Sequence, residues 1–147
     1  MCGAHATVRG FLGELVSKAP DAFDIVVDME AGLEHLSRGT GKHVSRFLAV
    51  VEPYYRSMET ARRVSDLARE LGIAEVSAIL NKVRTAADHD ALSEFCAVHK
   101  MTIIGEIPYD LGLADAERAG QPPLDFSPAT ASVTAMRRLT TDLIAAG

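Results

Sequence analysis

Four short apolar runs alternate along the chain with longer segments of helical periodicity. The runs are Asp24–Asp28, Phe47–Val51, Val76–Leu80 and Thr102–Ile107, the last ended by Pro108. Runs of this length, rich in β-branched residues and without polar alternation, predict strands that are buried on both faces.

The segments between these runs predict helices. The first apolar face is formed by Val8, Phe11, Leu12, Leu15 and Val16. The spacing of these residues (i, i+3, i+4, i+7, i+8) is that of one side of a helix.

Three further helices are expected downstream. Ser57 is the predicted N-cap of the second helix, and Gly72 is its predicted stop. The third begins near Asp88 and buries one side. The last has Pro128 in its first turn, after the polar stretch 120–127. The apolar positions of these three helices are Met58, Ala61, Val64, Leu67 and Leu71; Leu92, Phe95 and Cys96; and Val133, Met136, Leu139 and Leu143.

Strands that alternate with helices predict right-handed βαβ units around a parallel sheet. The expected fold is therefore a three-layer α/β/α domain that spans residues 1–147. In such sheets the functional residues lie just past the carboxyl ends of the strands. The positions to inspect are those after Asp28, after Val51, around Asn81 and around Pro108.

Composition narrows the classes of function. A net charge of −5 over 147 residues leaves no dense basic face for nucleic acid. No apolar run has the roughly 18 residues of a membrane span, and residues 1–11 do not resemble a signal peptide. Cys2 and Cys96 are the two cysteines, so no disulfide framework is indicated and the cytoplasm is the expected compartment.

Polar residues follow three of the predicted strands. Asp28, with Gly32 after it, has the chemistry of a carboxylate that holds Mg²⁺ near a phosphate, although a simple turn after a strand explains the pair equally well. Asn81 offers both a donor and an acceptor to the edge of an adenine. The rigid turn at Pro108 can flank the same base.

The motifs together resemble a known family. The stretches 1–10, 27–35 and 51–53 look like the MinD/ParA-related ATPases, and most like the CooC type, which matures the nickel centre of carbon monoxide dehydrogenase. Residues 81–82 and 105–110 fit the motifs on the adenine side of the same family. The resemblance implies an ATPase that dimerises with nucleotide between its subunits.

The resemblance also implies site residues. Asp28 would be the Mg²⁺-linked carboxylate and Gly32 the turn that senses the γ-phosphate. Asn81 and Pro108 would contact adenine, with Lys82, Tyr109 and Asp110 beside them. ATP and Mg²⁺ are the implied cofactors.

The family further carries a Cys-x-Cys pair that binds a metal across the dimer. Cys2 falls at the second cysteine of that pair, and Ni²⁺ or Zn²⁺ is the expected ion. Two thiolates from two subunits are fewer than the four ligands usual at such sites. His5 could assist. Cys96, on the buried face of a helix, is expected to be a core residue.

A phosphate-binding loop with the pattern G-x-x-x-x-G-K-[ST] is not found in the sequence. The nearest segment is Gly39–His43. When its Gly41 and Lys42 are aligned with the G-K of the pattern, Leu36 falls at the first glycine position and His43 at the Ser/Thr position. In the family, the strand before this loop lies between the strands that end here at Asp28 and Val51. We therefore expect these two strands not to be neighbours but to lie about 10 Å apart, twice the strand spacing.

These observations favour an interpretation of the chain as the C-terminal part of an ATP-dependent metallochaperone of the CooC type, inactive in hydrolysis by itself. Carbon monoxide dehydrogenase or another metalloenzyme is the expected partner. A complete small α/β protein whose sheet closes over the gap is the structural alternative. The functional alternatives are a non-catalytic regulatory subunit and a MinD/ParA-type partitioning ATPase, although the Cys2-to-His5 segment argues against the latter.

Overall fold

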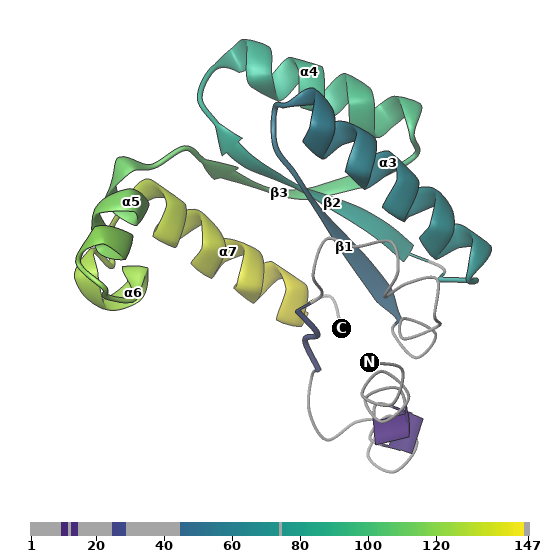
Figure 1. Cartoon of the computed structure of the whole chain (residues 1–147), viewed down its shortest axis with the longest axis horizontal. Helices are drawn as coiled ribbons and strands as arrows, with labels where there is room; N and C mark the ends of the chain where they lie inside the picture. The colour runs from purple at the N-terminus through teal and green to yellow at the C-terminus, as the bar shows by residue number, and fades with distance from the viewer. Residues whose placement is uncertain (1–9, 12, 15–24, 29–44, 74, 146–147) are drawn as a thin grey trace.

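The computed structural model contains a parallel sheet of three strands (Figure 1). The structure describes residues 10–11, 13–14, 25–28, 45–73 and 75–145. The strands are β1 (Arg46–Val51), β2 (Glu75–Val83) and β3 (Thr102–Pro108), and they lie side by side in that order. The prediction of a parallel α/β fold is thereby confirmed.

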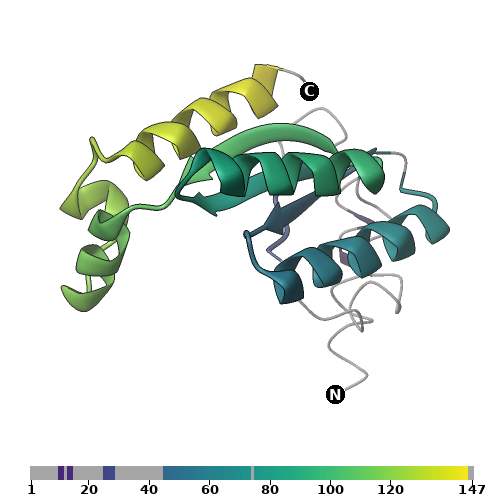
Figure 2. The same cartoon turned by 90° about the horizontal axis from the view of Figure 1, so that it is seen from above.

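Helices cover both faces of this sheet (Figures 1 and 2). The helices α3 (Tyr55–Glu70) and α4 (Ala86–Val98) pack on one face, and α7 (Ala131–Ala145) packs along β3 on the other. The short helices α5 (Leu111–Arg118) and α6 (Pro123–Phe126) follow the carboxyl end of β3. None of the described helices has the length and apolarity needed to span a bilayer.

The core lies between the sheet and the helices α3 and α4. Its largest fully buried side chains include Leu80 on β2, Leu92 on α4 and Val51 on β1. Five consecutive residues of β2, Val76–Leu80, are buried, as predicted for a strand that is covered on both faces. Cys96 is fully buried in the core, as expected from the sequence.

The face of the sheet covered by α7 shows one close approach. A Cβ atom at Gly105 on β3 would lie 2.9 Å from a methyl group of Leu139 on α7. Glycine at this position therefore allows α7 to pack tightly against β3.

The predicted first strand is not formed by the residues that the structure describes. Ile25 to Asp28 have no regular secondary structure, and Val26 is 90% exposed. A β-branched run becomes a strand only where a neighbouring strand pairs with its N–H and C=O groups. Here β1 pairs with β2 alone among the described residues, and Val50 on β1 is 53% exposed.

The expectation that residues 25–28 and β1 are not paired neighbours is thus met among the described residues. Their expected separation of about 10 Å presumed a strand at both positions, and it stays a prediction. The first predicted helix falls largely outside the described residues, but Gly10, Phe11, Gly13 and Glu14 are helical.

Helix ends show both agreement and correction. Gly72, at φ +81°, ends α3 as predicted, with backbone bonds from Gly72 to Arg69 and from Ile73 to Ala68. Ser57 does not cap this helix, because the helix begins earlier, at Tyr55. The hydroxyl of Ser57 instead accepts a hydrogen bond from the backbone N–H of Glu52, at 2.9 Å.

Two more helix starts differ by a few residues from the prediction. α4 begins at Ala86, where Thr85 and Asp88 form a reciprocal capping box that the sequence pattern did not single out. Pro128 lies before α7 and not in its first turn, since that helix begins at Ala131.

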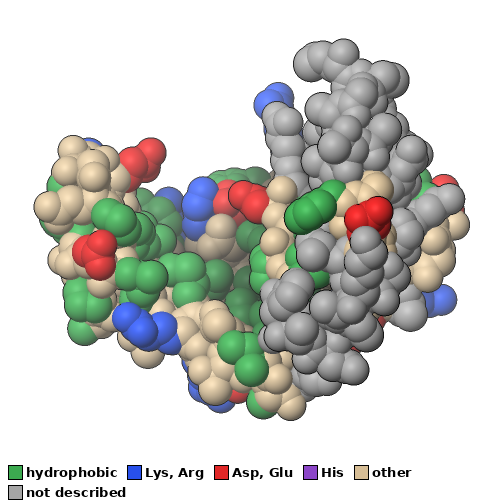
Figure 3. All heavy atoms as spheres, turned by 90° about the horizontal axis from the view of Figure 1, so that it is seen from below, with side chains coloured by type: hydrophobic (Ala, Val, Ile, Leu, Met, Phe, Trp, Pro, Cys, Tyr) green, Lys and Arg blue, Asp and Glu red, His purple; other side chains and the backbone are tan. Residues whose placement is uncertain are grey.

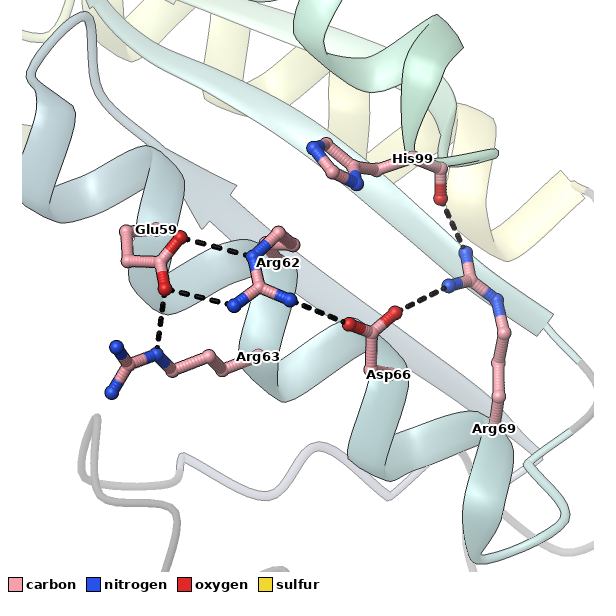
Figure 4. A network of polar contacts seen from close by, with 6 residues as sticks. All are labelled: Glu59, Arg62, Arg63, Asp66, Arg69 and His99. Carbon is pink, nitrogen blue, oxygen red and sulfur yellow. Dashed lines mark hydrogen bonds and ion pairs between the residues drawn. The ribbon is translucent and has the colours of Figure 1, made fainter.

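The charged side of α3 forms an ion-pair network (Figure 4). Arg62 binds both Glu59 and Asp66, and Arg69 joins Asp66 to the backbone oxygen of His99 at 2.7 Å. Hydrogen bonds from Arg62 and Arg63 lower the pKa of Glu59 to about 2. The charged side chains on this side of α3 thus pair at i,i+3 and i,i+4 spacings, and through Arg69 the network also connects α3 to the end of α4.

Candidate functional site

Polar side chains from β1 and β2 meet at the carboxyl edge of the sheet. Glu52 directly follows β1, and Asn81 and Lys82 lie near the end of β2. Lys82 Nζ lies 2.8 Å from Glu52 Oε1, and Asn81 Nδ2 donates to the same oxygen at 3.3 Å. The hydrogen bond from Glu52 raises the pKa of Lys82. This group, Glu52, Asn81 and Lys82, is called the edge cluster below.

The backbone of the edge cluster is irregular. Lys82 has φ +57°, a left-handed conformation that is uncommon for a residue other than glycine. The pairing of β2 with β3 shifts register between Asn81 and Val83. Such strain persists only where the surroundings impose it, and it is frequent at ligand sites.

The end of β3 brings an aromatic ring to the same edge. Asn81 is paired with Ile107, and Val83 with Pro108, so the turn at Pro108 lies beside the edge cluster. The N–H of Tyr109 donates to the backbone oxygen of Val83 at 2.8 Å. The guanidinium of Arg84 lies 3.9 Å from the centre of the Tyr109 ring, within cation–π range.

Asp110 connects two helices. Its carboxylate accepts hydrogen bonds from the N–H of Gly112 at 2.8 Å and from the N–H and hydroxyl of Ser132 at 3.1 and 2.8 Å. These bonds, chiefly those from Ser132, lower the pKa of Asp110 to about 2. In this structure Asp110 caps α5 and fastens it to α7, and a role in nucleotide binding stays a prediction.

Of the residues predicted to bind magnesium or another metal, Asp28 is the one that lies within the described residues. Asp28 is exposed and outside regular structure. Gly32 and Cys2 lie outside the described residues. Within the described ranges, no three His, Cys, Asp or Glu side chains are grouped as they would be around a metal ion.

The side chains gathered at the carboxyl edge are better suited to contact a nucleobase than phosphate groups. The side-chain amide of Asn81, the ring of Pro108 and the partly exposed ring of Tyr109 come from adjacent strand ends and offer polar and apolar contacts to a flat heterocycle. For the phosphates, the sequence holds no G-x-x-x-x-G-K-[ST] loop, and the ammonium of Lys82 is already paired with Glu52.

An open cavity of about 300 Å³ lies elsewhere, near the starts of β1 and β2. It is lined by Arg46, Glu75, Ile104, Leu139, Asp142 and Leu143. Figure 3 shows a hollow with hydrophobic side chains inside it and charged side chains at its rim. This cavity is distant in the fold from the edge cluster, because it adjoins the opposite ends of the strands.

Sequence reasoning singled out Asn81, Lys82, Pro108 and Tyr109 but missed Glu52 as a site residue. A polar residue directly after a buried strand was the available signal, the same one that identified Asn81. The roles of Arg84 and Ser132 had no comparable signal, because each depends on a contact with a residue more than 20 positions away.

The fold defines a class: the chain has the parallel α/β fold of the MinD/ParA-type P-loop ATPases. The MinD cell division protein of Aquifex aeolicus superposes with a TM-score of 0.75 at 20% identity, over 96% of this chain and 61% of the MinD chain. An identity this low establishes the fold alone.

Sequence similarity is more specific. The chain is 36% identical to the carbon monoxide dehydrogenase accessory protein CooC of Rhodospirillum rubrum over 129 residues, which are 88% of this chain and 48% of CooC. It is 35% identical to an uncharacterized ATP-binding protein of Methanocaldococcus jannaschii, over 83% of this chain and 47% of that protein. The resemblance to the CooC type is thereby confirmed.

The chain spans about half the length of these curated relatives. No protein-family model matches it.

Proposed function

We propose that the chain provides the adenine side and the Mg²⁺-switch side of the nucleotide site in a CooC-type ATPase that inserts nickel into carbon monoxide dehydrogenase. The observation that carries the proposal is the similarity to CooC over 88% of the chain. The meeting of Asn81, Pro108 and Tyr109 at the carboxyl edge of a parallel sheet supports it, because ligands of such sheets bind there.

In this proposal the described residues recognise the base. Asn81 binds the polar edge of adenine, while Pro108 and Tyr109 flank its ring. Lys82 shapes the edge through its ion pair with Glu52, and Asp110 shapes it as the N-cap of α5. Asp28 and Gly32 serve the Mg²⁺ and the γ-phosphate. Mg²⁺ and a phosphate-binding loop would neutralise phosphate charge during phosphoryl transfer, and the pattern of that loop is not found in this sequence.

The proposal includes a homodimer with a soft divalent metal, Ni²⁺ or Zn²⁺, held in part by Cys2. The protein works in the cytoplasm on carbon monoxide dehydrogenase or another metalloenzyme, without nucleic acid or membrane partners. These assignments rest on the resemblance to CooC.

Nucleotide binding tests the first part. Calorimetry with Mg-ATP is expected to show weak or no binding to the 147-residue chain, and tight binding to a protein in which an in-frame phosphate-binding loop precedes residue 1. Asn81→Ala in the longer protein is expected to weaken binding about tenfold, the usual effect of one lost hydrogen bond to a ligand. Tight Mg-ATP binding by the 147-residue chain would contradict the proposal.

Metal binding tests the second part. In the longer protein, Cys2→Ser is expected to lower the stoichiometry of bound Zn²⁺ or Ni²⁺, measured by elemental analysis of the dimer. Cys96→Ser is the matched control, since Cys96 is fully buried in the core and cannot reach a shared surface site. Unchanged stoichiometry in Cys2→Ser would remove the metal role.

A stimulation or inhibition of an intact CooC-type ATPase by added 147-residue chain, without turnover by the chain itself, would instead favour a regulatory subunit. Steady-state ATPase rates with and without the chain distinguish the two functions.

A further inference from the structure

One carboxylate oxygen at the carboxyl edge serves two neighbours. Glu52 Oε1 accepts from Lys82 Nζ at 2.8 Å and from Asn81 Nδ2 at 3.3 Å. The backbone N–H of Glu52 is itself held by the hydroxyl of Ser57 at 2.9 Å. Glu52 therefore has a defined position before any ligand binds.

This contact determines which end of the Asn81 amide faces Glu52. The two ends of an asparagine amide have nearly the same shape, and hydrogen bonding decides their orientation. An ionised carboxylate only accepts hydrogen bonds, so the NH₂ end must face it and the oxygen must face away. Among the described residues, Asn81 Oδ1 takes no hydrogen bond, so it is available as an acceptor.

An available acceptor at this place distinguishes the purine bases. Adenine carries an exocyclic amino group that can donate to Asn81 Oδ1, whereas guanine carries a carbonyl oxygen at the same ring position. Two acceptors facing each other repel and leave both without a partner, which is the arrangement that sites reject most strongly.

We propose that Glu52 is a positioning residue that fixes the orientation of the Asn81 amide and thereby makes the site select adenine over guanine. This inference rests on the proposed nucleotide function. Lys82 contributes to it, because its ammonium requires an oxygen at the position of Glu52 Oε1. The left-handed backbone at Lys82 brings that ammonium to the carboxylate side of the edge.

Nucleoside binding to the ¹⁵N-labelled 147-residue chain tests the inference without the phosphate loop. Titrations followed by chemical-shift changes compare adenosine with guanosine at millimolar concentrations. Wild type is expected to bind adenosine about tenfold more tightly than guanosine. Glu52→Ala is expected to bring the ratio close to one, and Glu52→Gln to retain most of it, because a glutamine oxygen still satisfies Lys82 and Asn81.

Glu75→Ala is the matched control. Glu75 also forms an ion pair from the end of a strand, with Arg46 at 2.9 Å, but it lies at the opposite end of β2. The ratio of adenosine to guanosine affinity is expected to be unchanged in this variant.

Hydrogen exchange of the two side-chain amide protons of Asn81 is a second measurement, and it reports directly on the hydrogen bond to Glu52. In wild type, the Nδ2 proton donated to Glu52 is expected to exchange with solvent more slowly than its partner proton. Glu52→Ala should remove that difference, and Glu52→Gln should preserve it.

The possible outcomes distinguish the positioning role of Glu52 from the proposed binding of adenine. If adenosine shifts the Asn81 resonances and Glu52→Ala leaves the base preference unchanged, the positioning role is overturned while the adenine site stands. If the 147-residue chain binds neither nucleoside, the same titration on the longer protein with its phosphate-binding loop decides, and absence of adenosine binding there overturns both. Equal exchange of the two Asn81 protons in wild type also overturns the positioning role.

Discussion

The packing of α4 on the sheet can be tested with Leu92→Ala. Leu92 is fully buried in the core shared by α3, α4 and the sheet. The substitution removes three carbon groups, and at about 0.8 kcal/mol for each the lost transfer free energy is about 2.4 kcal/mol. A residual cavity of about 50 Å³ adds about 1.2 kcal/mol at 24 cal/mol per Å³.

The expected loss in the free energy of unfolding is therefore about 3.6 kcal/mol, a large part of the 5–15 kcal/mol that is typical of a domain. Urea unfolding followed by circular dichroism measures it, with an unchanged m-value as the check that both states are comparable. Leu124→Ala on α6, where the leucine is 53% exposed, is the control and is expected to change stability by less than about 0.5 kcal/mol.

A loss below about 1 kcal/mol in Leu92→Ala would refute the reasoning. It would mean that α4 does not form a close-packed layer on β2 and β3, and the positions of the edge residues between these elements would lose their support.

Three other changes probe the helix ends and the ionisable pairs. Thr85→Ala removes the cap of α4 and is expected to lower the free energy of unfolding by about 1 kcal/mol in urea titrations. Because the pKa of Asp110 is lowered, its contribution to the free energy of unfolding is present above its ordinary pKa of 3.8 and is lost as the pH falls toward about 2. Between these pH values, the free energy of unfolding of Asp110→Asn should therefore fall less than that of wild type. The hydrogen bond to Glu106 raises the pKa of His89 above its ordinary value of 6.5, so the stability that this pair contributes is present below pH 6.5 and is lost as the pH rises above it. His89→Gln should therefore flatten the fall in melting temperature as the pH rises above 6.5.

Much of the carboxyl edge of the sheet could be predicted from the sequence because strand ends are local features. Asn81 and Pro108 each follow an apolar run, and parallel topology places such positions at one edge. The partner of Asn81 could not be read in the same way. Glu52 is 29 residues away, and only the pairing register of β1 with β2 brings their side chains together.

Asp110 illustrates a different limit. Its position after a strand-ending proline made it a reasonable ligand residue, yet its oxygens accept bonds from Gly112 and Ser132. Ser132 reaches it because α7 returns across the sheet, which no local pattern encodes.

The sequence by itself determined the elements whose signals are local. The buried run Val76–Leu80 formed the central strand, and Gly72 ended α3 because a left-handed residue there favours glycine. Only the tertiary structure decided the elements that depend on distant partners. Residues 25–28 have the composition of a strand, but a strand exists only where another strand pairs with it, and these residues pair with none of the three described strands. Helix signals are satisfied within a few residues, whereas strand pairing, ion pairs and binding edges require contacts that the folded chain alone creates.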